Sequence, residues 1–223
     1  MRILELFSGT KSWGKIADEL GWEVVSLDVD GNADINMSIL DWKYKEYEPG
    51  YFDIITASPP CHTFSGLRNC WIGREMKKLH PNQIITKEVL QKDINDFGLP
   101  LLHRALDIIY YFEPQYWFIE NPGNSKMKNY LQGVPFYKVD YCMYMDWGYK
   151  KPTIIWTNLE NFKPKRCNGN CRNTINGIHK SNIGGSSQIK GTTLLRKGTS
   201  LKERYRIPPE LIRDLFCCVI LND

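Results

Sequence analysis

Two reactive side chains of this sequence follow strand-like segments, and together they can carry out covalent chemistry. Cys61 comes after the apolar run Ile54-Ile55 and the turn Ser58-Pro59-Pro60, and Glu120 comes directly after the apolar segment 116–119. In an open parallel α/β sheet, ligands bind beyond the carboxyl ends of the strands. A thiol at such a place can attack a substrate as a nucleophile, and a carboxyl group can exchange a proton with it. The two residues therefore predict one reaction centre.

Cys61 has two other potential roles. It can be a metal ligand, or a small apolar side chain that fills a gap in the core. The two prolines before the thiol predict an abrupt loop at a strand end, which favours an accessible nucleophile over a buried filler. Glu120 taken alone is typical of an ordinary turn, and only its pairing with Cys61 favours a chemical role.

The N-terminal segment has the order of a nucleotide-binding βαβ unit. A strand is predicted over 3–7, a helix over 13–20, and a second strand over 23–27 that ends at Asp28. An acid at this place suits the hydroxyl groups of a ribose. Because Gly9 is the one glycine of the first turn, where dinucleotide folds usually have three, we expect S-adenosyl-L-methionine rather than a cofactor with a pyrophosphate. The alternatives are a turn that binds nothing and an Asp28 that caps a helix.

The composition is that of a globular intracellular protein. The 223 residues are 42% hydrophobic and 24% charged, which is sufficient for one full core. No apolar stretch approaches the roughly 20 residues that span a bilayer, and the N-terminus lacks the layout of a signal peptide. The seven cysteines are unevenly spaced, which argues against a disulfide framework. We expect an intracellular monomer.

Positive charge is concentrated in one segment near the C-terminus. Residues 163–206 contain eleven lysines and arginines and one acid, Glu203, which gives a net charge of +10. Since the whole chain carries +4, the remainder carries −6. A basic lobe on an acidic body is the pattern expected for docking of a polyanion such as DNA. The alternative is a solvated loop whose charges only keep it soluble.

The basic segment also contains residues of the types that bind zinc. Cys167, Cys171 and His179 lie close together in the sequence, and Cys142 is a candidate fourth ligand. A loop rich in glycine could use a metal ion to hold its shape. The spacing matches no common zinc finger, so the alternative is three unrelated side chains.

Further elements complete the predicted α/β pattern. They are a core-facing helix over 99–112, strands over 139–144 and 153–158, and a C-terminal helix from about residue 206. The turn between the two strands is expected to present Lys150 and Lys151. The polar loop over 66–81 could close over the site as a lid.

These motifs together resemble the cytosine-5 DNA methyltransferase family. The matching segments, in the order of the family, are Leu6-Phe7-Ser8-Gly9, Asp28, Ser58-Pro59-Pro60-Cys61-His62-Thr63-Phe64-Ser65 and Glu120-Asn121-Pro122. The resemblance covers residues 1–160 and resumes at 206–209, and it is closest in style to compact phage and large-virus members. It implies a Rossmann-like, S-adenosylmethionine-dependent methyltransferase fold, in which helices cover both faces of a mostly parallel sheet, with a small basic recognition lobe.

The resemblance also implies a role for each site residue. Cys61 adds to C6 of a cytosine that is flipped out of double-stranded DNA, and Glu120 hydrogen-bonds N3. Lys150 or Lys151 stands where the family uses arginine to hold the base, and we assign this role to Lys151. The cofactor pocket is implied to comprise Phe7, Ser8, Gly9, Thr10, Asp28, Val29 and Pro60.

We divide the chain into three parts and keep three alternative functions. The parts are a catalytic core over 1–158, a target-recognition lobe over 159–202, and a C-terminal helix over 203–223 that returns to the core. The first alternative is an amino-methyltransferase acting on N4 of cytosine or N6 of adenine, which leaves Glu120 without a role. The second is a catalytically inactive DNA-binding relative, because no Gly-Asn-Ser-Val-like segment closes the cofactor pocket. The third is a tRNA cytosine-5 methyltransferase, since RNA is not excluded as a substrate.

Overall fold

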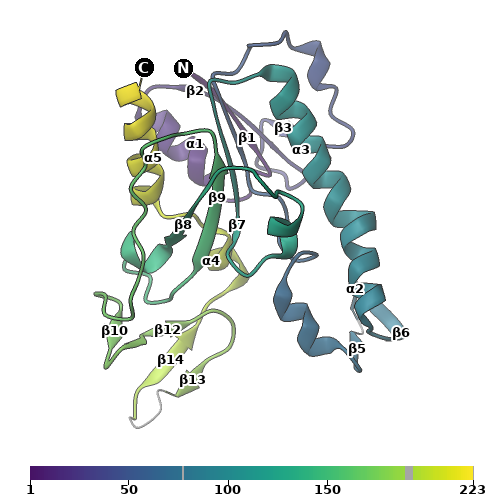
Figure 1. Cartoon of the computed structure of the whole chain (residues 1–223), viewed down its shortest axis with the longest axis vertical. Helices are drawn as coiled ribbons and strands as arrows, with labels where there is room; N and C mark the ends of the chain where they lie inside the picture. Colours follow the sequence, from purple (N-terminus) through teal and green to yellow (C-terminus); the bar gives the residue numbers. More distant parts are fainter. Residues whose placement is uncertain (77, 189–192, 223) are drawn as a thin grey trace.

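The core of the molecule is a seven-stranded sheet in the order β3-β2-β1-β4-β7-β9-β8 (Figure 1). The computed structural model describes residues 1–76, 78–188 and 193–222. The strands of this sheet are β1 (Arg2–Leu6), β2 (Glu23–Asp28), β3 (Ile35–Asn36), β4 (Ile54–Ala57), β7 (Tyr116–Pro122), β8 (Phe136–Asp140) and β9 (Pro152–Thr157). The first five in spatial order are parallel, and β9 runs antiparallel to both of its neighbours. The expected mostly parallel α/β sheet is confirmed.

Helices cover both faces of the sheet because the buried strands are apolar on both sides. On one face, α1 (Ser12–Glu19) and α5 (Pro209–Asn222) pack against alternate strand residues such as Ile3, Ile54 and Phe118. On the other face, α3 (Leu99–Phe112) packs against the intervening residues, which include Leu4 and Ile55. The expected helix over 99–112 is confirmed at both ends. The C-terminal helix begins at Pro209, and the short helix α4 (Leu201–Tyr205) precedes it.

Two strand predictions were wrong at their C-terminal ends. β7 does not stop before Glu120 but continues through Pro122, because its antiparallel neighbour β9 pairs Glu120 with Ile155. β8 ends at Asp140, and the next three residues form the 3₁₀ turn η5 (Tyr141–Met143). The predicted strand over 139–144 is therefore mostly this turn.

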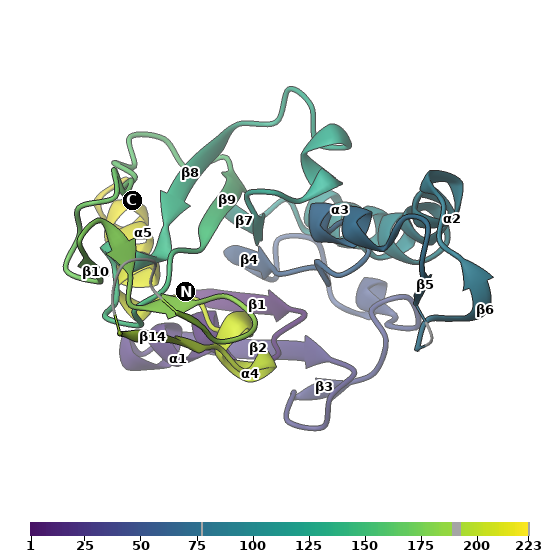
Figure 2. The same cartoon turned by 90° about the horizontal axis from the view of Figure 1, so that it is seen from below.

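Two appendages extend from one end of the sheet (Figure 1). The basic lobe contains the two-residue strands β10 (Thr174–Ile175), β11 (Ile178–His179), β12 (Ser181–Asn182) and β13 (Ser187–Gln188), together with β14 (Leu195–Gly198). Residues 189–192 of the expected lobe, which include Lys190, lie outside the described residues. Figure 1 and Figure 2 both show the lobe and the segment 66–98 on opposite sides of the molecule.

The expected lid has regular structure in its described part. It forms the 3₁₀ helix η2 (Gly66–Trp71) and a hairpin of β5 (Glu75–Met76) and β6 (His80–Ile84), which precede α2 (Lys87–Asp93) and the π-helical turn η3 (Ile94–Gly98). The buried Asp93 carboxylate binds the Arg68 guanidinium and, at 2.8 Å, His80 Nε2. These two contacts fasten the segment to α2. Movement of this segment as a lid stays a prediction.

In the part of the chain that the structure describes, every helix is too short or too polar to cross a membrane.

The N-terminus of α1 is capped from the sheet by the buried carboxylate of Glu5. Its two oxygens accept hydrogen bonds from Trp13 N at 3.1 Å and Gly14 N at 3.0 Å. Burial raises the pKa of Glu5 to about 7, against the opposing effect of these two amides. A Cβ on Gly14 would lie 2.8 Å from Glu5 Oε2, so only glycine admits the carboxylate here.

Glu5→Gln is expected to remove one component of the pH dependence of stability. The unfolded chain releases the Glu5 proton near the reference pKa of 4.5, whereas the folded chain keeps it to about pH 7. The wild-type free energy of unfolding should therefore decrease with rising pH over this interval by about 3 kcal/mol more than that of the variant. Denaturant titrations at pH 4.5, 6 and 7.5 measure the difference. The exposed Glu48→Gln serves as control, and parallel curves for wild type and Glu5→Gln would contradict the assignment.

Candidate active site

Cys61 lies in the loop after β4, and Glu120 lies in the last part of the neighbouring strand β7. β4 and β7 are parallel neighbours, with Ala57 opposite Ile119. Just beyond this pair, the buried Asn121 donates from Nδ2 to Pro59 O at 2.9 Å. This hydrogen bond fixes the Pro59-Pro60 turn to β7, so the thiol and the carboxyl group share one site as expected.

The Glu120 carboxyl group is buried and is held by two donors on one oxygen. Tyr141 donates its hydroxyl to Oε1 at 2.9 Å, and Lys151 Nζ lies 3.4 Å from the same oxygen. The ammonium of Lys151 also lies 4.7 Å from the centre of the Tyr141 ring and donates to Arg204 O at 3.0 Å. Burial and the nearby Glu120 raise the pKa of the Tyr141 hydroxyl well above its usual value, so it is a donor at neutral pH.

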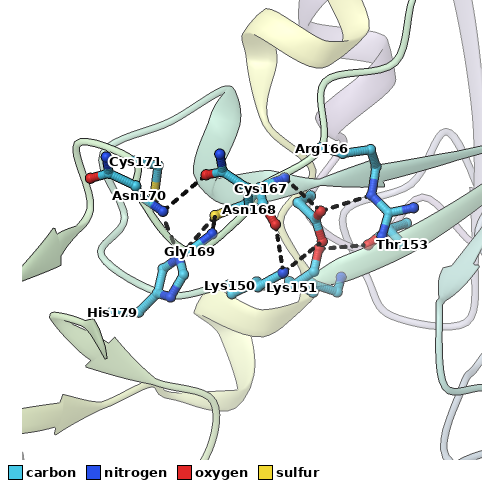
Figure 3. A network of polar contacts seen from close by, with 11 residues as sticks. Lys150, Lys151, Thr153, Arg166, Cys167, Asn168, Gly169, Asn170, Cys171 and His179 are labelled. Carbon is cyan, nitrogen blue, oxygen red and sulfur yellow. Dashed lines mark hydrogen bonds and ion pairs between the residues drawn. The ribbon is translucent and has the colours of Figure 1, made fainter. Parts of the chain in front are cut away.

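The turn before β9 does not present its two lysines together, contrary to the expectation. Lys151 is buried and contacts Glu120, whereas Lys150 Nζ donates to Cys167 O at 3.0 Å and lies 3.9 Å from Asp140 (Figure 3). The alternation of side chains along the extended backbone sends them to opposite sides. Of the two residues left open by sequence, Lys151 is therefore the one beside the reaction centre.

The Cys61 thiol is partly buried, which affects its reactivity. Burial and the neighbouring Glu120 raise its pKa above the ordinary value, and the positive charges of Lys151 and Arg204 lower it to a smaller extent. Because the thiolate is the nucleophile, the free protein holds this group mainly as a thiol at neutral pH.

Sequence reasoning missed Tyr141 and the segment 204–205. Tyr141 was placed inside an expected strand, where its hydroxyl had no assigned direction. Arg204 and Tyr205 belong to α4, a helix that was not predicted because its segment was identified only by its basic composition. Burial raises the pKa of Tyr205, with a further contribution from Cys61. Arg204 and Tyr205 are close to the Cys61 thiol only because the C-terminal part of the chain returns to the sheet.

The residues implied to bind the cofactor gather at the ends of β2, β1 and β4. Phe7 and Gly9 have φ angles of 56° and 47°, in the left-handed region, which gives the turn after β1 its tight shape. Gly9 N donates to Asp28 Oδ2 at 2.8 Å, and Asp30 N donates to Oδ1 at 3.0 Å. Asp28 therefore binds this turn, and the cap of α1 is Glu5.

The carboxylate acceptor and the apolar surface of this turn suit a nucleoside. Val29 is 66% exposed directly after the Asp28 carboxylate, so an apolar face adjoins an acceptor for ribose hydroxyls. Ser8 is buried and donates from N to Leu27 O, and Thr10 Oγ1 lies 2.8 Å from Ser12 Oγ. Ser12 Oγ in turn accepts Ile207 N at 3.2 Å, which brings the C-terminal segment beside the turn. Pro60 belongs to the adjoining loop after β4.

The structure assembles the four candidate metal ligands. The ligand atoms of Cys142, Cys167, Cys171 and His179 all lie within 4.8 Å of one another. His179 Nε2 is 3.7 Å from Cys167 Sγ and 3.5 Å from Cys171 Sγ. The candidate fourth ligand, Cys142, reaches the group from η5, next to Tyr141.

Comparison with known proteins gives one relative of high similarity. No protein-family model matches the chain. A protein of Frog virus 3 (isolate Goorha), described as a probable DNA (cytosine-5)-methyltransferase, is 42% identical over 223 residues, with 96% of this chain and 98% of the relative covered.

Several solved structures are similar at low sequence identity. The Entamoeba histolytica methyltransferase EhMeth has a TM-score of 0.48 at 15% identity, with 74% of this chain and 55% of that chain covered. The Dnmt2 methyltransferase of S. pombe has a TM-score of 0.42 at 14% identity, with 74% and 51% covered. A putative DNA modification methyltransferase encoded within an E. coli prophage has a TM-score of 0.45 at 15% identity, with 100% and 69% covered. The chain spans about half the length of the first two.

Glu120→Gln is expected to accelerate alkylation of Cys61. The substitution removes a negative charge that raises the thiol pKa and leaves Lys151, which lowers it. At pH 8 the rate with iodoacetamide should increase several-fold, whereas Lys151→Met should decrease it. Mass spectrometry of the Cys61 peptide measures the rate, and the exposed Cys217 in the same sample is the reference. Equal rates in all three proteins would show that the two charges do not act on the thiol.

Proposed function

The chain belongs to the DNA (cytosine-5)-methyltransferase family, whose members methylate carbon 5 of cytosine with S-adenosyl-L-methionine, and from this premise we propose how its own residues divide the reaction. The resemblance inferred from the sequence motifs agrees with this membership. It was closest to compact phage and large-virus members, and the relative is a viral protein. We assign catalysis to residues 1–158, DNA recognition to 159–202, and closure of the cofactor side to the segment 203–223. The observation that carries the proposal is the placement of Cys61 beside a Glu120 carboxyl group that is held by two donors.

Cys61 is the nucleophile in this proposal. Its thiolate forms a bond to C6 of cytosine, and the electron pair of the C5–C6 double bond moves toward C5 and N3. S-adenosyl-L-methionine, when bound at the β1 turn, supplies the methyl group. C5 forms a bond to that methyl group as the bond between the methyl group and the cofactor sulfur breaks, which leaves S-adenosyl-L-homocysteine. Loss of the C5 proton to water and of the Cys61 sulfur as thiolate then restores the ring.

Glu120 stabilises the charge that develops on the cytosine ring. Tyr141 and Lys151 both donate to Oε1, which leaves Oε2 to face the base. A proton shared between Oε2 and N3 offsets the negative charge that moves onto the ring, which lowers the barrier for addition at C6. Lys151 takes the place of the family arginine and holds Glu120 by a single charge-assisted contact.

The cofactor site of the proposal is the turn at the end of β1 with its neighbours. Asp28 accepts from the ribose hydroxyls, and Val29 and Phe7 contact the adenine through apolar surface. Ser8, Gly9 and Thr10 form the wall of the pocket, and Pro60 separates it from the Cys61 thiol. The polar and apolar groups described above support this assignment.

The basic lobe is proposed to contact the phosphates of double-stranded DNA around a flipped cytosine. A base within a stacked duplex does not expose C6, so it must leave the helix to reach Cys61. Several basic residues of the lobe are engaged in ion pairs, among them Arg166 with Asp140 and Arg172 with Asp146. The exposed Lys197 and Lys202 are therefore our candidates for phosphate contacts.

We also propose that the Cys142, Cys167, Cys171 and His179 cluster binds Zn²⁺. Three thiolates and one imidazole form an established set of structural zinc ligands. With tetrahedral geometry and ordinary zinc distances, sulfur and nitrogen ligands lie about 3.6 Å apart. The two sulfur–nitrogen distances of 3.7 and 3.5 Å around His179 agree with this spacing.

A covalent complex with 5-fluorocytosine is the expected result for the wild-type protein. Fluorine at C5 cannot leave as a proton does, so the Cys61 adduct should persist after methyl transfer and survive denaturing electrophoresis. Cys61→Ser should abolish the complex, whereas Cys70→Ser, which changes an exposed thiol in the next segment of the chain, should keep it.

Parallel reactions with single-stranded RNA and a tRNA separate the substrates. A wild-type protein that forms no adduct with any DNA would contradict the proposal. Methylation of exocyclic amino groups would instead support an amino-methyltransferase, and an adduct with tRNA alone would support the RNA enzyme.

DNA affinity is expected to fall steeply as the salt concentration rises, because the basic lobe contacts the phosphates. Replacing Lys197 and Lys202 together by Gln should make the slope of log K against log salt shallower by about two, since each phosphate contact contributes about one. The matched control replaces Lys43 and Lys45, which belong to the 3₁₀ turn η1 (Tyr44–Glu46) and its N-terminal cap, outside the lobe. Fluorescence anisotropy between 50 and 200 mM salt measures the slope. An unchanged slope would remove these two residues from the interface.

A further inference from the structure

We infer that a metal ion at the Cys/His cluster clamps the basic lobe to the core and thereby sets the two side chains that hold Glu120. This inference rests on the proposed function and adds to it a role for the metal. Three ligands, Cys167, Cys171 and His179, belong to the lobe, whereas Cys142 belongs to the turn η5 that directly follows core strand β8. A bound ion therefore cross-links two segments that are separate in the sequence.

The lobe has too little apolar core to hold its own shape. Its described strands β10 to β13 have two residues each, and its cysteines are free rather than joined as disulfides. The buried residues of its described part are Leu159, Phe162, Cys167, Asn173 and His179. Units of about 40 residues usually need a disulfide or a metal ion for stability. Two of the five buried residues are ligands of the cluster, which is the expected position for such an ion.

Buried polar contacts connect the cluster to the segment 140–151. The Asp140 carboxylate, fully buried, accepts from Cys167 N at 2.9 Å and from Arg166 Nε at 2.8 Å (Figure 3). Lys150 Nζ donates to Cys167 O at 3.0 Å. Because Cys167 contacts both Asp140 and Lys150, its position affects both ends of this segment.

A second set of contacts comes from the side chain of Asn173. Its Nδ2 donates to Cys142 O at 2.7 Å and to Met145 O at 2.8 Å, and its Oδ1 accepts Gly148 N at 2.9 Å. The lobe therefore holds the loop after β8 at three backbone positions, next to the metal ligand Cys142. Groups of this kind commonly orient metal ligands and are oriented by them.

The segment held in this way carries both donors to Glu120. Tyr141 precedes Cys142 within one 3₁₀ turn, and its hydroxyl reaches Glu120 at 2.9 Å. Lys151 ends the segment, and Tyr141 N donates to its carbonyl oxygen at 3.2 Å. Loss of the metal would release Cys142 and thus the backbone of Tyr141. Small displacements of a catalytic group can reduce rates by two orders of magnitude. Tyr141 is accordingly a positioning residue for Glu120.

The first experiment removes the metal from the intact protein. Elemental analysis should find one zinc per chain, and chelation should leave affinity for S-adenosyl-L-methionine within about twofold, because that pocket lies at β1 and β2. The rate of adduct formation with 5-fluorocytosine DNA should fall at least tenfold and return on addition of ZnCl₂. Hydrogen exchange should increase in peptides covering 140–151 and 166–180 but stay constant in β1 and β2.

Substitutions at His179 and Tyr141 distinguish loss of the metal clamp from a general loss of folding. His179→Cys keeps four zinc ligands and should retain metal, exchange protection and adduct formation, whereas His179→Ala should lose all three while keeping cofactor affinity. Tyr141→Phe, with the metal in place, should lower the adduct rate with little change in DNA affinity. A loss confined to the rate, with DNA and cofactor affinities kept, distinguishes positioning of Glu120 from a general structural effect.

Three results would overturn the inference. They are absence of zinc uptake by the purified protein, unchanged exchange in 140–151 after chelation, and a full adduct rate for the metal-free protein. Failure of the proposed function is a different result, in which zinc-loaded wild-type protein binds the cofactor but forms no adduct. Metal content and hydrogen exchange would still decide in that case whether the clamp exists.

Discussion

The buried Glu120 carboxyl group is the constraint on which the arrangement of the site depends. Removing a carboxylate from water costs several kcal/mol unless donors compensate for it. Lys151 and Tyr141 supply those donors on one oxygen, and they come from a segment far from β7 in sequence. The insertion of β9 between β7 and β8 is what brings that segment to the carboxyl group. The sheet order and the chemistry are therefore linked through one side chain.

Glu5 is another buried carboxyl group, and it is stabilised in a different way. It has two backbone amides of α1 as partners, and its pKa rises to about 7. Its role is to connect the first strand to the first helix and so to shape the turn at 7–11. The residues of that turn that we propose to bind the cofactor depend on it, although Glu5 itself faces the helix.

We propose that the basic lobe takes part in both recognition and catalysis. Its cationic surface suits DNA phosphates, while its buried side contacts the loop that positions Tyr141 and Lys151. A lobe with so few apolar contacts gains its shape from polar groups and, as we propose, from zinc. Docking of DNA on this lobe and the geometry around Glu120 are then physically connected.

The sequence by itself determined the α/β class and the helix over 99–112, and its motifs predicted that Cys61 and Glu120 share a site and that the turn with Asp28 binds the cofactor. These features depend on local apolar periodicity and on short motifs, which a linear sequence displays directly. Only the tertiary structure decided that Lys151 rather than Lys150 faces Glu120, that Tyr141 shares this contact, and that Cys142 joins the Cys/His cluster. It also extended β7 through Glu120 and assigned the cap of α1 to Glu5. Each of these depends on contacts between residues distant in sequence, where the neighbouring strand or turn, and not local propensity, sets the position of the side chain.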